Sequence, residues 1–167
     1  MQPENLTDVG NLALVIYTLI PTLKAIGYMR VSEIMVKDPV RVFPDTSVAE
    51  IARLMRDRGI GSVVLVKDDQ AVGIVTERDL VRRVLALGKD PASTKAFDIC
   101  TKLVATTSDN ADLELVVDIM NSYNIRRLVI VDRNKVVGIV TTDDIWRNYR
   151  QLSEELAVKY MSMSGCK

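Results

Sequence analysis

Apolar and polar positions along residues 31–87 change their period in a fixed order. A short alternating stretch predicts a strand, and apolar residues at helical spacing follow it and end before Gly59. Two continuous apolar runs separated by a polar turn then predict a hairpin of buried strands, after which the pattern is helical again. The predicted order is therefore β-α-β-β-α, over 39–43, 48–58, 63–66, 71–75 and 77–87.

The same pattern is repeated 65 residues downstream without an insertion. Residues 31–84 align with 96–149, and the best match is Val-Gly-Ile-Val-Thr, which occurs at 72–76 and again at 137–141. A gapless repeat of this length indicates one supersecondary unit present twice. One copy has too little sheet to bury both of its helices, so we expect the copies to pack on a pseudo-twofold axis and share a core sheet against sheet. The predicted fold class is α/β.

Composition divides the chain into five segments, with the two repeats as the central ones. In order they are an N-terminal apolar helical extension at 1–30, the first repeat at 31–87, a linker containing Gly, Pro and Ser at 88–95, the second repeat at 96–149 and a polar, Met-rich tail at 150–167.

The N-terminal extension allows three interpretations. Its longest apolar run, 12–20, ends at Pro21, whereas a membrane span needs ~20 apolar residues. Acidic residues precede this run, so it lacks the basic start of a secretory signal. The segment can be a helix that covers an apolar face, a weak membrane anchor, or a non-native start upstream of Met29. If the start is non-native, we expect a chain that begins at Met29 to fold and bind ligand unchanged.

Composition and charge exclude several classes of function. The 22 basic and 22 acidic residues cancel, which disfavours nucleic-acid and membrane partners. Histidine is absent, and the two cysteines have neither metal-ligand spacing nor a disulfide framework. We therefore expect no catalytic residues, no metal site and no resident cofactor, and a reducing, cytoplasmic location.

The repeated motifs resemble those of the cystathionine-β-synthase (CBS) domain, a tandem pair of which is called a Bateman module. The resemblance lies in Ser32-Glu-Ile-Met35, Gly59-Ile60 and Gly73–Asp79, and in their recurrence within the second copy. Similar pairs bind AMP, ADP, ATP or S-adenosylmethionine in clefts between the copies, and they regulate other proteins without catalysing a reaction. The resemblance thus implies an adenine nucleotide as regulatory ligand, an effector protein as partner and a homodimer, since single modules of this kind usually pair.

The last strand-to-helix turn of each repeat carries the predicted ligand chemistry. A Thr and an Asp three residues apart share one face near a helix N-terminus, where an ionised Asp can accept both hydroxyls of a ribose. These residues are Thr76 and Asp79 in the first copy and Thr141 and Asp144 in the second. The alternative is that both Asp residues only cap their helices.

The resemblance extends the predicted binding set to apolar and basic positions. It places the adenine against Val40, Ile60 and Ile74 in one cleft and against Ala105, Ile125 and Ile139 in the other. Positions that reach the phosphates in similar modules are Gly61 and Ser62 in the first copy and Arg126 and Arg127 in the second. Arg126 and Arg127 can serve either cleft, or can simply be surface charges at a strand end.

The two clefts are expected to differ in charge. Arg78 of the first copy corresponds to Asp143 of the second, and an arginine attracts a phosphate that an aspartate repels. The Asp79 cleft is therefore the favoured nucleotide site.

Two rival functions remain. One is a ligand-free structural or dimerisation module. The other is a nucleic-acid-binding protein, which depends on a local patch of Arg78, Arg82, Arg83, Arg126 and Arg127.

Overall fold

The computed structural model describes residues 29–68, 70–102 and 105–163. The predicted apolar extension, apart from its last two residues, lies outside the described residues. The elements are α2 (Val31–Ile34), β1 (Val36–Lys37), β2 (Arg41–Val42), α3 (Val48–Arg58), β3 (Ser62–Lys67), β4 (Gln70–Thr76), α4 (Glu77–Arg83), the 3₁₀ turn η1 (Leu85–Leu87), α5 (Ala96–Ile99), β5 (Thr101–Lys102), β6 (Thr106–Ser108), α6 (Leu113–Ser122), β7 (Arg127–Asp132), β8 (Lys135–Thr141) and α7 (Thr142–Met163).

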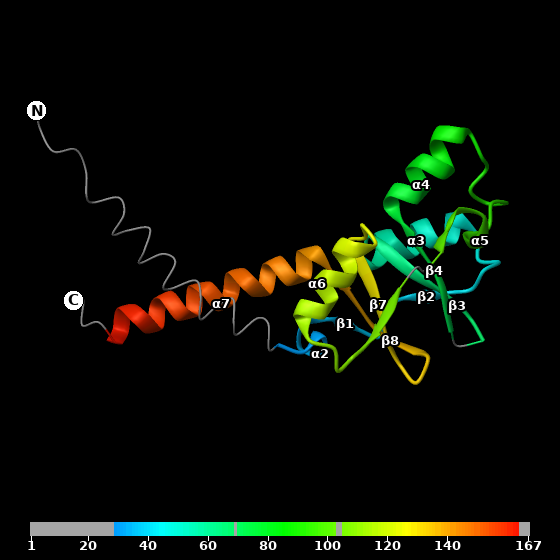
Figure 1. The fold of residues 1–167 in the computed structure, drawn as a ribbon. Coiled ribbons are helices and arrows are strands. Elements are labelled where there is room, and N and C mark those ends of the chain that lie inside the picture. The colour runs from blue at the N-terminus through cyan, green and yellow to red at the C-terminus, as the bar shows by residue number, and fades with distance from the viewer. Residues whose placement is uncertain (1–28, 69, 103–104, 164–167) are drawn as a thin grey trace, which may run out of the picture.

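The predicted β-α-β-β-α order is confirmed in both repeats (Figure 1). In each repeat a short strand pairs in parallel with the first strand of the hairpin: β2 with β3, and β6 with β7. The hairpin strands pair antiparallel, and both hairpins contain a register shift at the same place, after Leu65 and after Ile130. The described residues thus form two equivalent four-stranded sheets, ordered β2-β3-β4-β5 and β1-β8-β7-β6.

One of the two edge strands of each sheet comes from the other repeat. We call residues 31–37 and 96–102 the lead-in segments of the first and second repeats. The first lead-in segment places β1 against β8, and the second places β5 against β4. The sequence pattern predicted no elements in these segments, which belong to one repeat by sequence and add a strand to the sheet of the other. Each sheet is completed only when its partner repeat is present.

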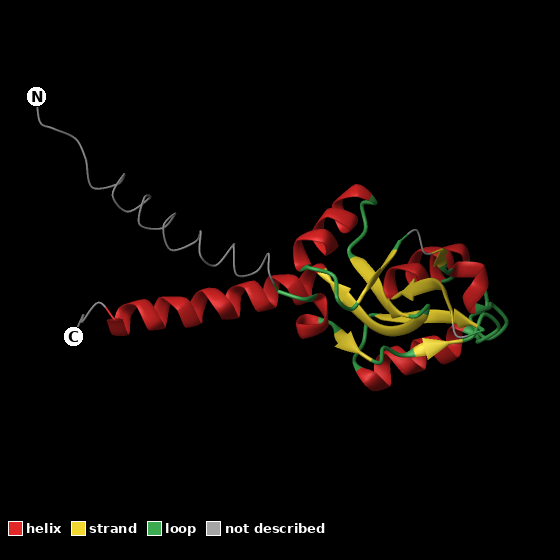
Figure 2. Cartoon of the chain, turned by 60° about the horizontal axis from the view of Figure 1, so that its bottom comes forward, coloured by secondary structure: helices red, strands yellow, loops and turns green. Residues whose placement is uncertain are grey.

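The repeats share a core, as predicted. One cluster of buried side chains belongs to each repeat, and a further cluster lies between the two hairpins, consisting of Val64, Val66, Ile74, Val129, Val136 and Ile139. Figure 2 shows the strands gathered in the centre with helices on the outside. The lead-in segments follow the exchange, because Ile34 is buried in the second repeat's core and Ile99 in the first.

The last helix of each repeat differs from its predicted length. α4 ends at Arg83 because Val84 leaves the helical region, with φ −121° and ψ −68°, and is buried in the first core. The helix predicted over 143–149 continues to Met163 as α7, which extends away from the sheets in Figure 1. An ion pair between Arg150 and Glu154, four residues apart, supports this extension. No helix in the described part of the chain is long and apolar enough to cross a membrane.

Candidate functional site

A cavity of about 650 Å³ lies between the two repeats, beside the junction of β4 and α4. The first repeat contributes the end of β4 and the exposed side of α4. The second repeat contributes β5, Ala105 and the turn between α6 and β7. The described lining residues are Gly61, Ile74, Thr76, Glu77, Arg78, Asp79, Arg82, Arg83, Thr101, Lys102, Ala105, Tyr123, Asn124, Ile125, Arg126 and Arg127.

Thr76 and Asp79 form a reciprocal capping box at the start of α4. The Asp79 Oδ2 atom accepts from the Thr76 backbone N–H at 2.9 Å and from the Thr76 hydroxyl at 2.7 Å. The Asp79 N–H in turn donates to Thr76 Oγ1 at 3.3 Å. Such a box satisfies backbone donors that the first turn of a helix leaves without partners. It also fixes the carboxylate, whose residue is only 8% exposed although it lines the cavity.

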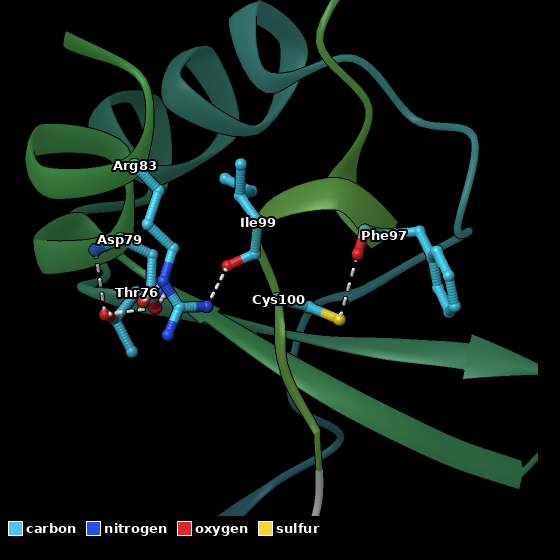
Figure 3. Close-up of polar contacts among 6 residues, drawn as sticks. All are labelled: Thr76, Asp79, Arg83, Phe97, Ile99 and Cys100. Carbon is cyan, nitrogen blue, oxygen red and sulfur yellow. Dashed lines mark hydrogen bonds and ion pairs between the residues drawn. The ribbon is translucent and has the colours of Figure 1, made fainter. Parts of the chain in front are cut away.

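Arg83 occupies the second oxygen of the same carboxylate. Its Nε lies 3.4 Å from Asp79 Oδ1, one helical turn away. Its terminal nitrogen donates to the backbone oxygen of Ile99 at 2.5 Å. Figure 3 shows the guanidinium between Asp79 and Ile99, reaching from α4 to the end of α5. Arg83 therefore connects the first repeat to the lead-in segment of the second.

The equivalent aspartate of the second repeat has the same cap but a different neighbour. Asp144 Oδ2 accepts from the Thr141 N–H at 2.9 Å and from its hydroxyl at 2.6 Å. The counterpart of Arg83 is Asn148, whose amide donates to the Asp144 backbone oxygen at 2.9 Å and so stays within its own helix. Arg147, a highly exposed side chain, lies 4.0 Å from Asp144 Oδ1. The first junction thus has a connection across the repeats where the second has a bond within one helix.

The charge of the cavity is positive although the chain is neutral overall. Among the described residues that line it, six are Lys or Arg and two are Glu or Asp. Arg126 and Arg127 come from the second repeat and Arg78, Arg82 and Arg83 from the first, so the charge depends on the packing of the repeats. A concave surface with one sign of charge concentrates counter-ions of the opposite sign.

The structure brings together nine of the residues that sequence reasoning proposed for binding. They are Gly61, Ile74, Thr76, Arg78, Asp79, Ala105, Ile125, Arg126 and Arg127. The expected grouping of apolar residues by repeat differs from this lining, because Ala105 and Ile125 line the same cavity as Ile74. Both arginines of the 126–127 pair line the Asp79 cavity.

The remaining proposed residues lie elsewhere. Val40 and Ile60 pack against the core of the first repeat, and Ile139 belongs to the core that the repeats share. Ser62 begins β3, and Thr141, Asp143 and Asp144 lie at the junction of β8 and α7. Thr141, Asp143 and Asp144 are therefore around the second repeat's own junction and outside the lining of the described cavity.

Several lining residues were absent from the proposed binding set. Arg82 and Arg83 entered the sequence argument only as part of a nucleic-acid patch, although the four-residue spacing of Asp79 and Arg83 is typical of a helical ion pair. No sequence motif marked Thr101, Lys102 or Tyr123 as a binding residue. Their place in the cavity follows from the exchange of lead-in segments, which the periodicity of the chain does not reveal.

Nothing in the described residues indicates a metal centre: they contain no group of three or more Cys, Asp or Glu side chains close enough to hold an ion. Cys100, the cysteine among the described residues, belongs to the lead-in segment of the second repeat and is partly buried. Burial raises the pKa of the Cys100 thiol, which makes it a weak nucleophile at neutral pH.

Two equivalent α/β units with exchanged lead-in segments and a cavity between them define a tandem domain pair. The family model of the CBS domain matches residues 31–86 and 96–145, which together form most of the chain. The chain belongs to the CBS domain family, and the resemblance recognised in the motifs is confirmed.

Known proteins are similar over the paired domains. Protein MK0525 of Methanopyrus kandleri is 44% identical over 117 residues, which covers 69% of this chain and 60% of that protein. CBS domain-containing protein YhcV of Bacillus subtilis is 34% identical, over 76% of this chain and 89% of YhcV. This chain spans about three fifths of the length of MK0525 and of a second archaeal relative.

A solved structure with the same fold contains adenosine compounds. It is the CBS domain pair of protein MJ0100 in complex with 5′-methylthioadenosine and S-adenosyl-L-methionine. The TM-score is 0.66 at 30% identity, with 74% of this chain and 98% of that chain covered.

Proposed function

We propose that this chain is a regulatory module that binds an adenine nucleotide in the cavity beside Asp79. The single observation that carries the proposal is a fixed, nearly buried carboxylate in a cavity whose other charges are mostly positive. A carboxylate held in this way suits a ribose diol, and the arginines suit phosphates. The bound adenosine compounds of the similar MJ0100 domain pair support the same class of ligand.

Each part of the proposed ligand has complementary residues in the cavity. The ribose hydroxyls donate to Asp79, the base lies against Ile74 and Ile125, and the phosphates extend towards Arg126 and Arg127. Charge-assisted hydrogen bonds of this kind contribute about 1.5–3 kcal/mol each.

The charge of the cavity selects among adenosine ligands. S-adenosylmethionine carries a positive sulfonium group, which the surplus of cations disfavours, whereas each added phosphate is attracted. We therefore propose ATP and ADP ahead of AMP, and all three ahead of S-adenosylmethionine. Ligand binding changes the relative pose of the two repeats, and a partner protein reads this change in a cytoplasmic homodimer. A ligand can shift that pose only by its differential affinity for the two states.

One observation favours a second candidate, a structural module without a ligand. Asp79 and Asp144 both complete capping boxes, a role that needs no ligand. The electropositive cavity is what the structural candidate leaves without explanation.

Thermal unfolding with ATP, ADP, AMP, adenosine and S-adenosylmethionine separates these candidates. A ligand at ~100 times its dissociation constant stabilises the folded state by ~2.7 kcal/mol. The matched variants are Asp79→Asn and Asp144→Asn, since asparagine keeps a side-chain oxygen for the cap and removes the charge. We expect stabilisation by ATP that Asp79→Asn removes and Asp144→Asn retains. Loss in Asp144→Asn alone would move the site to the second junction, and no stabilisation by any ligand would favour the structural module.

A further inference from the structure

Arg83 makes two polar contacts to different repeats with different nitrogens. Nε contacts Asp79 Oδ1 within α4, and a terminal nitrogen donates to the Ile99 oxygen at the end of α5. The side chain is partly exposed, while Asp79 is nearly buried and Ile99 is fully buried. The partly exposed side chain of Arg83 therefore joins two buried residues.

Both contacts satisfy atoms that need a partner. The last carbonyl groups of a helix have no N–H donor within the helix, and α5 is only one turn long, so the Ile99 oxygen needs a donor from elsewhere. Asp79 Oδ1 is the oxygen that the capping box leaves free, since Thr76 contacts Oδ2. Arg83 thus fixes the orientation of the carboxylate and the end of α5 with one rigid, planar group.

The segment that Arg83 holds is also a wall of the cavity. After Ile99 and one intervening residue, Thr101 and Lys102 form β5, pair with Ile74 and Gly73 of β4 and line the cavity. The Asp79 carboxylate and β5 both face the cavity, and the Arg83 side chain therefore connects them through the end of α5. The second repeat replaces this side chain with Asn148, which bonds within α7.

We propose that Arg83 is a positioning residue that couples the Asp79 carboxylate to the lead-in segment of the second repeat. A ribose at Asp79 must share Oδ1 with Arg83, so its binding is linked to the position of α5 and β5. This last step rests on the function proposed above, whereas the link between Asp79, Arg83 and α5 exists without a ligand. The coupling is reciprocal: the factor by which ribose binding stabilises the lead-in segment is also the factor by which loosening that segment weakens ribose binding.

Amide hydrogen exchange of the full chain tests the link without any ligand. The reporters are the amides of 96–102, including the Cys100 N–H, which donates to Ala96 within α5. We expect Arg83→Asn and Asp79→Asn each to speed this exchange about tenfold, and the double variant to add nothing further, since each breaks the same link. Arg83→Lys keeps the charge but cannot make both contacts, so it should behave as Arg83→Asn. Asn148→Ala, at the equivalent position of the second repeat, should leave the exchange of 96–102 unchanged. Additive effects of Arg83→Asn and Asp79→Asn, or unchanged exchange in both, would overturn the proposal.

Binding of adenosine and 2′-deoxyadenosine tests the ribose step, because neither carries a phosphate that the charge of Arg83 could attract. We expect the wild type to prefer adenosine and Arg83→Lys to lose about tenfold of that preference. An undiminished preference in Arg83→Lys would contradict the positioning role. If the wild type binds neither these nucleosides nor ATP, the proposed function fails, while the exchange experiment still decides whether Arg83 couples Asp79 to α5.

Discussion

Gly138 of the second repeat packs closely against the side chain of Met35 of the first. A Cβ atom added to Gly138 would be 3.0 Å from Met35 Cγ and closer still to its sulfur. The equivalent pair in the other half is Gly73 and Cys100, where an added Cβ would be 3.0 Å from the Cys100 sulfur. The repeated glycine of the motif therefore leaves room for the lead-in segment of the partner repeat, at the hairpin edge where that segment adds a strand.

Gly138→Ala should destabilise the protein, by about 1–3 kcal/mol, because the new methyl group overpacks against Met35. Met35→Ala combined with Gly138→Ala should cost less than the sum of the two single changes, since the clash disappears with the longer side chain. Urea unfolding of the four proteins in this double-mutant cycle measures the coupling, which we expect to be about 1 kcal/mol. Strict additivity would mean that the first lead-in segment does not lie over β8.

Removal of the first lead-in segment should destabilise the second repeat. Val31 and Ile34 are buried in the second repeat's core, and burying each side chain contributes about 1.5–3 kcal/mol. A chain that begins at Pro39 should therefore unfold at much lower urea concentration than the full chain. The control begins at Met29, because it keeps the bond from the Leu113 N–H to the Met29 oxygen at 2.9 Å. Equal stability of both shortened chains would argue against the exchange.

Arg126 should contribute to phosphate binding and little to nucleoside binding. It lines the cavity from the second repeat and is exposed, so its change to alanine leaves the core intact. We expect Arg126→Ala to lower ATP affinity about tenfold or more and to leave adenosine affinity unchanged, measured by calorimetry. Arg53→Ala, an exposed arginine on α3, is the charge-matched control. Equal losses for ATP and adenosine would show that Arg126 shapes the cavity instead of binding a phosphate.

Cys100 should react slowly with alkylating reagents in the folded protein. Burial raises the pKa of its thiol, so the thiolate is scarce at neutral pH. A Cys166→Ser variant makes Cys100 the sole reporter, and its alkylation rate should rise with pH and rise sharply in urea. Because the pKa of the Cys100 thiol is higher in the folded than in the unfolded protein, its contribution to the free energy of unfolding depends on pH. That contribution is fully present below the unfolded-state pKa and is lost as the pH rises through the folded-state pKa. A folded-state rate equal to that in urea would contradict a protected thiol.

Local patterns were enough to predict the hairpins, the main helices and the presence of a shared core. Alternating or continuous apolar runs report which side chains are buried, and a gapless repeat reports that the burial is shared. The extent of α4 and α7 was harder to predict, because Val84 turns into a core that exists only after folding, and residues beyond 149 have a polar pattern that does not exclude helix. Trp146 of α7 is 65% exposed and stacks on Tyr149.

The candidate site was only partly predictable, for a related reason. Thr76 and Asp79 are three residues apart, so their capping box is a local structure that sequence spacing indicates. Thr101, Lys102 and Tyr123 reach the cavity from the other repeat, and their type and spacing carry no trace of this.

The sequence by itself determined that two copies of one α/β unit are present, that each has a Thr and an Asp three residues apart at its last strand-to-helix turn, and that the family is that of the CBS domain. Only the tertiary structure decided that β1 and β5 pair with the opposite repeat, that Arg126 lines the same cavity as Asp79, and that Arg83 connects Asp79 to Ile99. The physical reason is the range of the interactions involved. Periodicity and caps depend on neighbours within one or two turns, whereas strand exchange and the charge of a cleft depend on which distant surfaces are buried together.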